Sequence, residues 1–171
     1  MERKDKVRDI MENIQKQIQD ITLHATEHDL VLLEQLLKGF QLWKSGKNTT
    51  FISSLLQMDR KITDDDCVIT IPISPLLYNT LNIVHGGITA TLLDTAMGVL
   101  ANSLVPDGYG AVTTQLNINY IAAGIGEHMV CRAKMEHKGS KTLVLSAEIH
   151  RSDGVKIAIG TGSFLVIEKR I

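Results

Sequence analysis

One carboxylate stands in the middle of an otherwise apolar segment, and it has the clearest chemical potential in the sequence. Asp94 lies between Leu93 and Met97 in GGITATLLDTAMGVLANSLV, residues 86–105. Burying a carboxylate costs free energy unless the group is paired or is kept for chemistry. Asp94 is therefore either a structural residue that pairs with a backbone group or a lysine, or a general base.

The start of the same segment offers a second chemical feature. Val84-His85-Gly86-Gly87 precedes the apolar run, and the two glycines have no side chains to block a ligand. Free amides at a helix N-terminus, at the positive end of the helix dipole, can stabilise a developing oxyanion. Gly-Gly alone is also typical of a tight strand-to-helix turn. Together with Asp94 it indicates acyl transfer, with an oxygen-stabilising end and a base.

The spacing of these two features predicts a site shared between subunits. Gly87 and Asp94 are seven residues apart, so on a helix they share a face but are separated by about 10 Å. A reacting group must lie within about 3 Å of its catalytic partner. If both features act on one substrate, they come from different subunits and the enzyme is an obligate dimer.

Residues 1–47 differ in period from the rest of the chain. Apolar residues recur every three or four positions between Val7 and Ile21, and again between Leu30 and Phe40, as on one face of a helix. Ser45-Gly46 is a helix stop signal. The block holds eight Lys/Arg and eight Asp/Glu, so it has no basic face. We expect a helical extension, packed on the main domain or on a partner subunit.

Residues 48–171 have the pattern of strands around one helix, which is an α+β class. Alternation of apolar residues from Cys67 to Ile73 predicts a strand. The segment 86–105 is apolar on nearly every side, as expected of a helix buried all round. Four more strands are expected at about 111–121, 128–137, 142–151 and 155–167. The pattern favours an antiparallel sheet wrapped around one central buried helix, with edges covered in a homodimer or a tetramer made of two dimers.

Three segments of this domain resemble a known family. NTLNIVHGGITATLLDTAMG, residues 79–98, resembles the signature of the PaaI-like (phenylacetyl-CoA thioesterase) branch of hotdog-fold acyl-CoA thioesterases. AVTTQLNINYIAA, residues 111–123, is similar to the family's next strand, and KGSKT, residues 138–142, to its lysine-rich turn. The resemblance covers about residues 50–168. It implies the hotdog fold and hydrolysis of an acyl-CoA to a free acid and CoA.

The resemblance also assigns roles to residues. Asp94 would be the general base that activates water, or else a nucleophile, and the Gly86 amide would polarise the thioester carbonyl from the neighbouring subunit. Asn79 and His85 would shape and orient the site, and Thr113 would hold the attacking water.

Six further positions are expected to contact the substrate. They are Gly87, Asn82, Lys138, Gly139, Ser140 and Lys141. The last four would lie near the CoA phosphates, where positive charge is useful.

The pocket mouth, the orientation of Thr113 and the lining of the acyl pocket can also be predicted. Asn82 stands where relatives commonly have glycine, which could narrow or polarise the pocket mouth. Strict strand alternation places Thr113 on one face with Gln115 and Asn117, opposite Val112 and Leu116. The acyl pocket is expected to be aliphatic, lined by Ile83, Ile88 and Leu92, which suits fatty acyl and aryl groups alike.

Other interpretations fit the residues less well. HATEH, residues 24–28, matches a zinc-protease string, but it lies in a polar helix connection, so no metal site and no cofactor is expected. A dehydratase on the same fold would need a proline-rich His motif that is missing. The alternative from another class is a non-catalytic acyl-CoA sensor or partner-binding hotdog protein, which would tolerate loss of Asp94.

Composition restricts partners and compartment. The net charge of -1 gives no reason to expect nucleic acid or an anionic membrane surface. The charged start, MERKDKVRDIM, is unlike a signal peptide, and no apolar run is long enough to span a membrane. Cys67 and Cys131 lack CxxC spacing and are expected to be buried free thiols. These features predict a cytoplasmic protein.

Overall fold

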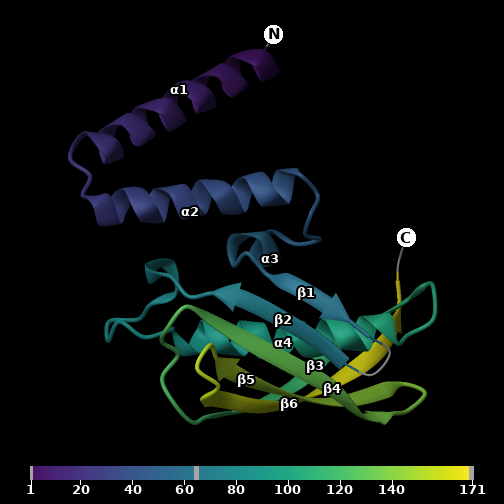
Figure 1. Ribbon diagram of the computed structural model, residues 1–171. Coiled ribbons are helices and arrows are strands. Elements are labelled where there is room, and N and C mark those ends of the chain that lie inside the picture. Colours follow the sequence, from purple (N-terminus) through teal and green to yellow (C-terminus); the bar gives the residue numbers. More distant parts are fainter. Residues whose placement is uncertain (1, 64–65, 170–171) are drawn as a thin grey trace.

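The computed structural model describes residues 2–63 and 66–169, and it places one curved sheet around one helix (Figure 1). The helices are α1 (Glu2–Leu23), α2 (Glu27–Lys44), α3 (Phe51–Leu55) and α4 (Gly86–Ser103), with a 3-10 turn, η1, at Pro75–Leu77. The strands are β1 (Asp59–Ile62), β2 (Asp66–Pro72), β3 (Tyr109–Tyr120), β4 (His128–Lys138), β5 (Thr142–Arg151) and β6 (Lys156–Glu168). The hotdog fold and the α+β class are confirmed.

The sheet is antiparallel throughout and has the order β1-β2-β4-β5-β6-β3. Alternate residues of its strands face α4 and form the core with the buried side of that helix. The strongest examples are Ile69, Met129 and Ile149, which are fully buried. Strand alternation and turn residues therefore predicted β2 to β6 to within two residues at each end.

The short elements between residues 48 and 62 were not predicted. β1 is only four residues long, and all four are exposed, so the strand has no apolar alternation. It is added to the sheet by its pairing with β2, in which Asp59 lies opposite Thr70. α3 has five residues, and its start is capped by Thr50, whose hydroxyl accepts from the Ser53 amide. Pairing with β2 places β1, whereas α3 has a local signal in Thr50 as well as its contact with α2.

The side of α4 that faces away from the sheet departs from the prediction. We expected a helix buried all round, but Thr91, Asp94, Thr95 and Val99 are only partly buried. The sheet of one chain encloses the other side of the helix, where Leu92, Leu93, Ala96, Met97 and Leu100 have no exposed surface. The prediction is therefore wrong for the single chain, since an apolar run does not reveal which side of the helix its own sheet leaves uncovered.

The helical extension stands apart from the sheet (Figure 1). α2 contacts α3, and a Cβ at the buried Gly39 would lie 2.9 Å from the Leu55 Cα, so glycine permits the close approach. In α1 every residue from Lys4 to Leu23 is exposed. Packing on the main domain is thus wrong for α1, while packing on a partner subunit and the domain boundary at residue 47 stay predictions.

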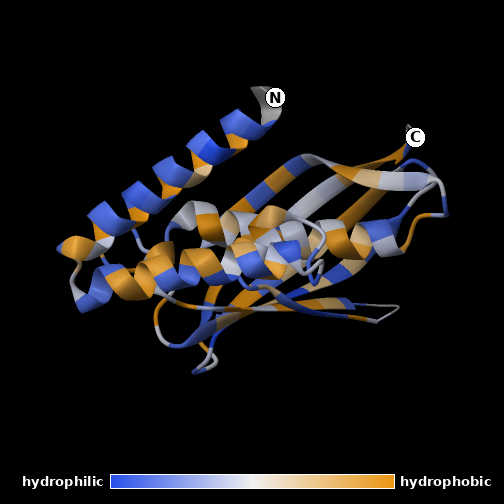
Figure 2. Ribbon diagram, turned by 90° about the horizontal axis from the view of Figure 1, so that it is seen from above, coloured by the Kyte–Doolittle hydropathy of each residue, from blue (hydrophilic) through white to orange (hydrophobic). Residues whose placement is uncertain are grey.

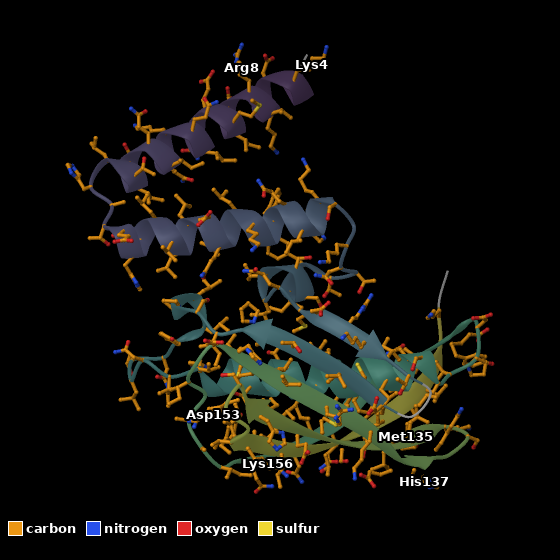
Figure 3. All side chains as sticks on the ribbon, in the orientation of Figure 1. Lys4, Arg8, Met135, His137, Asp153 and Lys156 are labelled. Atoms are coloured by element: carbon orange, nitrogen blue, oxygen red, sulfur yellow. The ribbon has the colours of Figure 1, made fainter. Side chains whose placement is uncertain are left out.

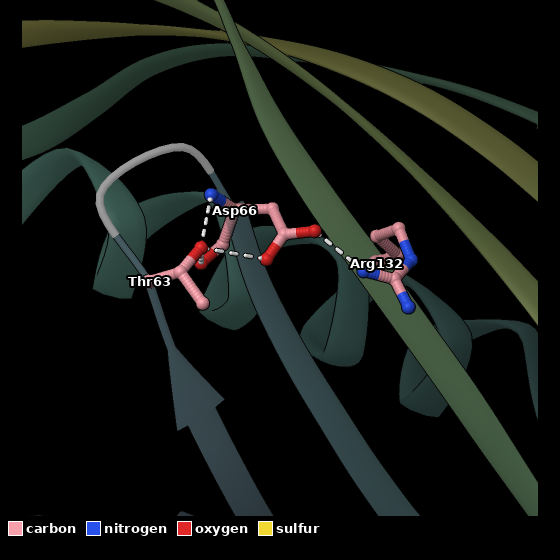
Figure 4. Close-up of polar contacts among 3 residues, drawn as sticks. All are labelled: Thr63, Asp66 and Arg132. Atoms are coloured by element: carbon pink, nitrogen blue, oxygen red, sulfur yellow. Dashed lines mark hydrogen bonds and ion pairs between the residues drawn. The ribbon is translucent and has the colours of Figure 1, made fainter.

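A polar contact fixes the start of β2 to its neighbour (Figure 4). The Thr63 hydroxyl and the Arg132 guanidinium both donate to the Asp66 carboxylate, and the Asp66 amide donates back to the Thr63 hydroxyl. The hydrogen bond from Thr63, followed by that from Arg132, lowers the pKa of Asp66. The contact joins Thr63 to the start of β2 and ties that start to β4.

Two smaller predictions can be compared directly with the structure. Cys67 and Cys131 are free and buried, as expected. None of the helices in the described part of the chain is both long and apolar enough to cross a membrane.

Candidate active site

Asp94 is held by a hydroxyl from the edge strand of the sheet. Thr113 Oγ1 on β3 donates a hydrogen bond of 2.8 Å to Asp94 Oδ1 on α4. Asp94 itself is partly buried. One carboxylate oxygen is therefore oriented by Thr113, while Oδ2 makes no hydrogen bond within the described residues and is free to accept a proton from water.

A β-bulge brings Thr113 to this side of the strand. In the pairing of β3 with β6, Thr113 lies opposite Phe164 and Gln115 lies opposite Ser163, so Thr114 is the extra residue. After the bulge Leu116 and Ile118 face the core, and before it Ala111 does. The expectation that Thr113 shares a face with Gln115 and Asn117 is therefore wrong, because strict alternation does not allow for the inserted residue.

A hollow of about 670 Å³ opens beside Asp94. It continues along α4 past Gly98 and Val99 to Asn102, with β1 on one side and β3 on the other. The lining residues from the two strands are Arg60, Ile62, Ala111, Val112 and Thr113. The contribution of β1 was not foreseen, because β1 itself gives no sequence signal. The hollow begins at the carboxylate and is lined by both polar and apolar residues.

The other half of the predicted site lies at the start of α4. His85 is the N-cap residue, and the Gly87 amide donates to His85 Nδ1 over 2.9 Å. A Cβ on Gly87 would lie 3.1 Å from that nitrogen, so glycine leaves room for the cap. The Gly86 amide has no hydrogen-bond acceptor within the part of the chain that the structure describes. It is therefore the amide at this helix end that remains able to bind an oxyanion.

Tyr120 orients this end of the helix. Its hydroxyl donates to the Gly86 carbonyl over 3.1 Å, and a Cβ on Gly86 would lie 3.4 Å from the ring. A second hollow, of about 350 Å³, lies here and is lined by Asn79, Ile83, Gly86 and Tyr120 among others. Sequence reasoning missed Tyr120, because the bulge at Thr114 hides that it shares a face with Thr113.

Asn79 and Asn82 shape the loop before α4. Asn79 Oδ1 accepts from the Leu81 amide at 2.9 Å and from the Ile83 amide at 3.4 Å, so this side chain holds the loop closed. Asn82 has a φ of 56° and is exposed. Glycine or asparagine is favoured in that left-handed conformation. The backbone thus explains why Asn82 can replace a glycine.

The remaining predicted contacts fall into two groups. Ile83 and Ile88 are partly buried at the start of α4, and Ile83 lines the second hollow. Leu92 is fully enclosed in the core and lines neither hollow. Lys138 is the last residue of β4, and Gly139, Ser140 and Lys141 form the turn from β4 to β5. Thr142, after this turn, lies opposite Leu165, which in turn lies opposite Val112. The turn is therefore at the Asp94 end of the sheet, about 10 Å from β3.

The structure brings these residues together in two separate places. Asp94 and Thr113 form one, and His85, Gly86, Gly87 and Asn79 form the other. Gly86 and Asp94 are eight residues apart on one helix, which is about 12 Å along its axis. One thioester cannot reach both within one chain. Within the described residues, no group of three or more His, Cys, Asp or Glu is arranged to hold a metal ion.

Comparison with known proteins bears on both the fold and the family. Residues 81–158 match the thioesterase superfamily model. The BH2602 protein of Bacillus halodurans, whose crystal structure was determined with CoA, is 36% identical with a TM-score of 0.84, covering 90% of this chain and 99% of that one. Acyl-coenzyme A thioesterase PaaI of Escherichia coli is 28% identical over 96 residues, 56% of this chain and 66% of that protein.

A further relative, from Halobacterium salinarum and named as a putative esterase, is 34% identical over 91 residues, 48% of this chain. This chain spans 60% of that relative's own length. The match to BH2602 covers 90% of the chain and so includes part of residues 1–47. On the fold, the family match and the likeness to BH2602 and PaaI, the chain belongs to the thioesterase superfamily, as a PaaI-like protein with the hotdog fold.

Proposed function

We propose that the chain is an acyl-CoA thioesterase in which Asp94 activates water. The water oxygen attacks the thioester carbonyl carbon while Asp94 Oδ2 accepts its proton. The carbonyl oxygen becomes an oxyanion, which the free Gly86 amide at the helix N-terminus stabilises. The C–S bond then breaks, CoA leaves as its thiolate and takes up the proton, and the acid is released.

The active site in this proposal is shared by two copies of the chain. β3 is an edge strand of 12 residues, so one side of its backbone is free to pair. Thr113, near one end of β3, holds Asp94, while Tyr120, at the other end, holds Gly86. Antiparallel pairing of β3 with β3 of a second copy sets the Asp94 half of one chain beside the Gly86 half of the other.

One register of this pairing agrees with the direction of the side chains and brings the two halves of the site together. Residues opposite one another in an antiparallel pair point to the same face. A two-fold axis at Asn117 sets Gln115 opposite Asn119 of the second copy. Because the bulge leaves Thr114 out, Thr113 then lies opposite Tyr120 of the second copy, and both side chains face the helices.

In this arrangement the acyl chain and the CoA phosphates of the substrate would each lie beside residues that suit their chemistry. The acyl chain would lie in the hollow that begins at Asp94 and is bordered by Ile62, Val99 and Val112. The exposed Lys138 and Lys141 of the β4–β5 turn would attract the CoA phosphates. The similarity to the CoA-bound BH2602 protein supports CoA as the carrier.

The observation that carries the proposal is the combination, on one helix, of an oriented carboxylate and an unpaired amide at the helix start.

The proposed thioesterase activity is tested by free-thiol release from acyl-CoAs with short, medium and long chains and from phenylacetyl-CoA. Hydrolysis of any of them supports the enzyme. Binding of these thioesters without thiol release would instead support a non-catalytic acyl-CoA sensor.

Thr113 provides a test of how Asp94 is positioned. Thr113→Val keeps the shape of the side chain but removes the donor to Asp94 Oδ1. A hydrogen bond to a charged group contributes about 1.5–3 kcal/mol, so we expect kcat to fall by about tenfold or more, with KM little changed. Thiol release over a range of acyl-CoA concentrations measures both constants.

Thr114→Val is the matched control, because the Thr114 hydroxyl donates to the Ser163 carbonyl and not to Asp94. It should retain kcat within about threefold. Equal losses in the two variants would show that Thr113 acts through the stability of β3 and not through Asp94.

A further inference from the structure

α1 carries an apolar face that nothing in the described part of its own chain covers. Val7, Ile10, Met11, Ile14, Ile18 and Ile21 share this face, and between 37% and 55% of each residue is exposed. Figure 2 shows the hydrophobic residues gathered along one side of α1. In Figure 3 the labelled Lys4 and Arg8 project from α1 away from the sheet domain. We call the six apolar residues the α1 seam.

The spacing of the seam is that of a helix that packs on another helix. Val7, Ile14 and Ile21 recur every seven residues, and Ile10 lies three residues after Val7. This is the a and d pattern of a coiled coil. Gln17 is the one polar residue at an a or d position between Val7 and Ile21.

The charges of α1 disfavour a lipid or nucleic-acid partner. Residues 2–23 contain five basic and five acidic side chains. Helices that lie on anionic membranes carry an excess of Lys and Arg on the polar face, and nucleic-acid binding requires a basic surface. A helix with a long apolar seam and balanced charge suits a protein partner with the same features.

The residues along one edge of the α1 seam indicate that this partner is α1 of a second copy, running in the opposite direction. Lys6, Asn13 and Asp20 follow one another at seven-residue intervals along one edge of the seam. Antiparallel pairing of two α1 helices about Asn13 sets Lys6 against Asp20 of the second copy, twice, and Asn13 against its counterpart. Parallel pairing would set Lys6 against the apolar Met11 instead.

We propose that α1 pairs antiparallel with α1 of a second copy of this chain, through the α1 seam and two Lys6–Asp20 ion pairs. Neither Lys6 nor Asp20 has an ion-pair partner in the described part of its own chain. The pairing is centred on the helix, so its full length of about 33 Å takes part. This contact is separate from the pairing of β3 and does not depend on catalysis.

The pairing is tested by cross-linking the full-length chain. In Asn13→Cys, the two new thiols lie side by side across the seam and should be joined by a short bismaleimide at neutral pH into a covalent dimer. Glu12→Cys is the control, one residue away and turned from the seam, and it should cross-link about tenfold less. The native thiols do not compete, because burial raises the pKa of Cys67 to about 11 and also raises the pKa of Cys131.

Charge reversal then tests the direction of the pairing. Added to Asn13→Cys, Lys6→Asp should lower the cross-linking yield by about two- to fivefold, and Lys6→Asp with Asp20→Lys should restore it. Cross-linking of Asn13→Cys no greater than that of Glu12→Cys would overturn the pairing. Equal yields with and without charge reversal would overturn the antiparallel register. Thiol release from acyl-CoA, measured on the same samples, reports separately on the proposed enzyme.

Discussion

Asp94→Asn should lower kcat for acyl-CoA hydrolysis by at least about a hundredfold, the usual contribution of a general base. The amide oxygen introduced by this change can still accept from Thr113, and the side chain has nearly the same shape. The change therefore removes basicity and charge while leaving the packing of α4 intact. Thiol release at saturating acyl-CoA measures kcat, and thermal unfolding checks that the fold is retained.

Asp107→Asn is the control for the loss of one negative charge. Asp107 is exposed, lies in the connection between α4 and β3, and lines neither hollow. It should leave kcat unchanged. Retention of full activity by Asp94→Asn would contradict the role of this carboxylate and would favour a binding function.

Gly86→Pro should lower kcat by about a hundredfold to a thousandfold, because proline removes the amide proposed to bind the oxyanion. The backbone can accept the change. Gly86 is the first residue of α4, where proline is favoured, and His85 has the extended conformation, with ψ of 135°, that a residue before proline requires. The measurement is again thiol release, with unfolding temperature as the check on stability.

Gly86→Ala distinguishes the loss of the Gly86 N–H from the effect of an added side chain. It adds a Cβ at 3.4 Å from the Tyr120 ring but keeps the N–H, so its loss of kcat should be much smaller than that of Gly86→Pro. Equal losses in the two variants would mean that crowding against Tyr120, and not loss of the amide, causes the effect.

The elements with a regular pattern are predictable from the sequence. Alternation from Cys67 onward and the turn residues between strands placed β2 to β6, and the apolar run from Gly86 placed α4. The start of α4 at Gly86 was also predicted, whereas the cap that His85 Nδ1 provides to the Gly87 amide was not. In each case the signal is a short-range property of the chain.

The features that were missed depend on contacts between distant residues. The bulge at Thr114 reverses the direction of every side chain beyond it on β3, and no residue type marks it. Thr113 and Tyr120 therefore both face α4, against strict alternation. β1 has four exposed residues and exists because β2 offers it an edge. The open side of α4 could not be foreseen, because the sequence does not say whether its own sheet or a second copy covers it.

The proposed site requires Asp94 and Gly86 to act on one substrate from two different chains. This requirement is tested most directly with a heterodimer, purified through two different affinity tags, of one Asp94→Asn chain and one Gly86→Pro chain. Each homodimer is expected to be nearly inactive. In the heterodimer one site combines both defects, while the other combines an intact Asp94 with an intact Gly86.

We expect this heterodimer to recover about half of the wild-type activity per dimer, since one of its two symmetric sites is whole. If Asp94 and Gly86 instead served one site within a single chain, every chain of the heterodimer would carry a defect. Activity no higher than that of the two inactive homodimers would therefore contradict the shared site.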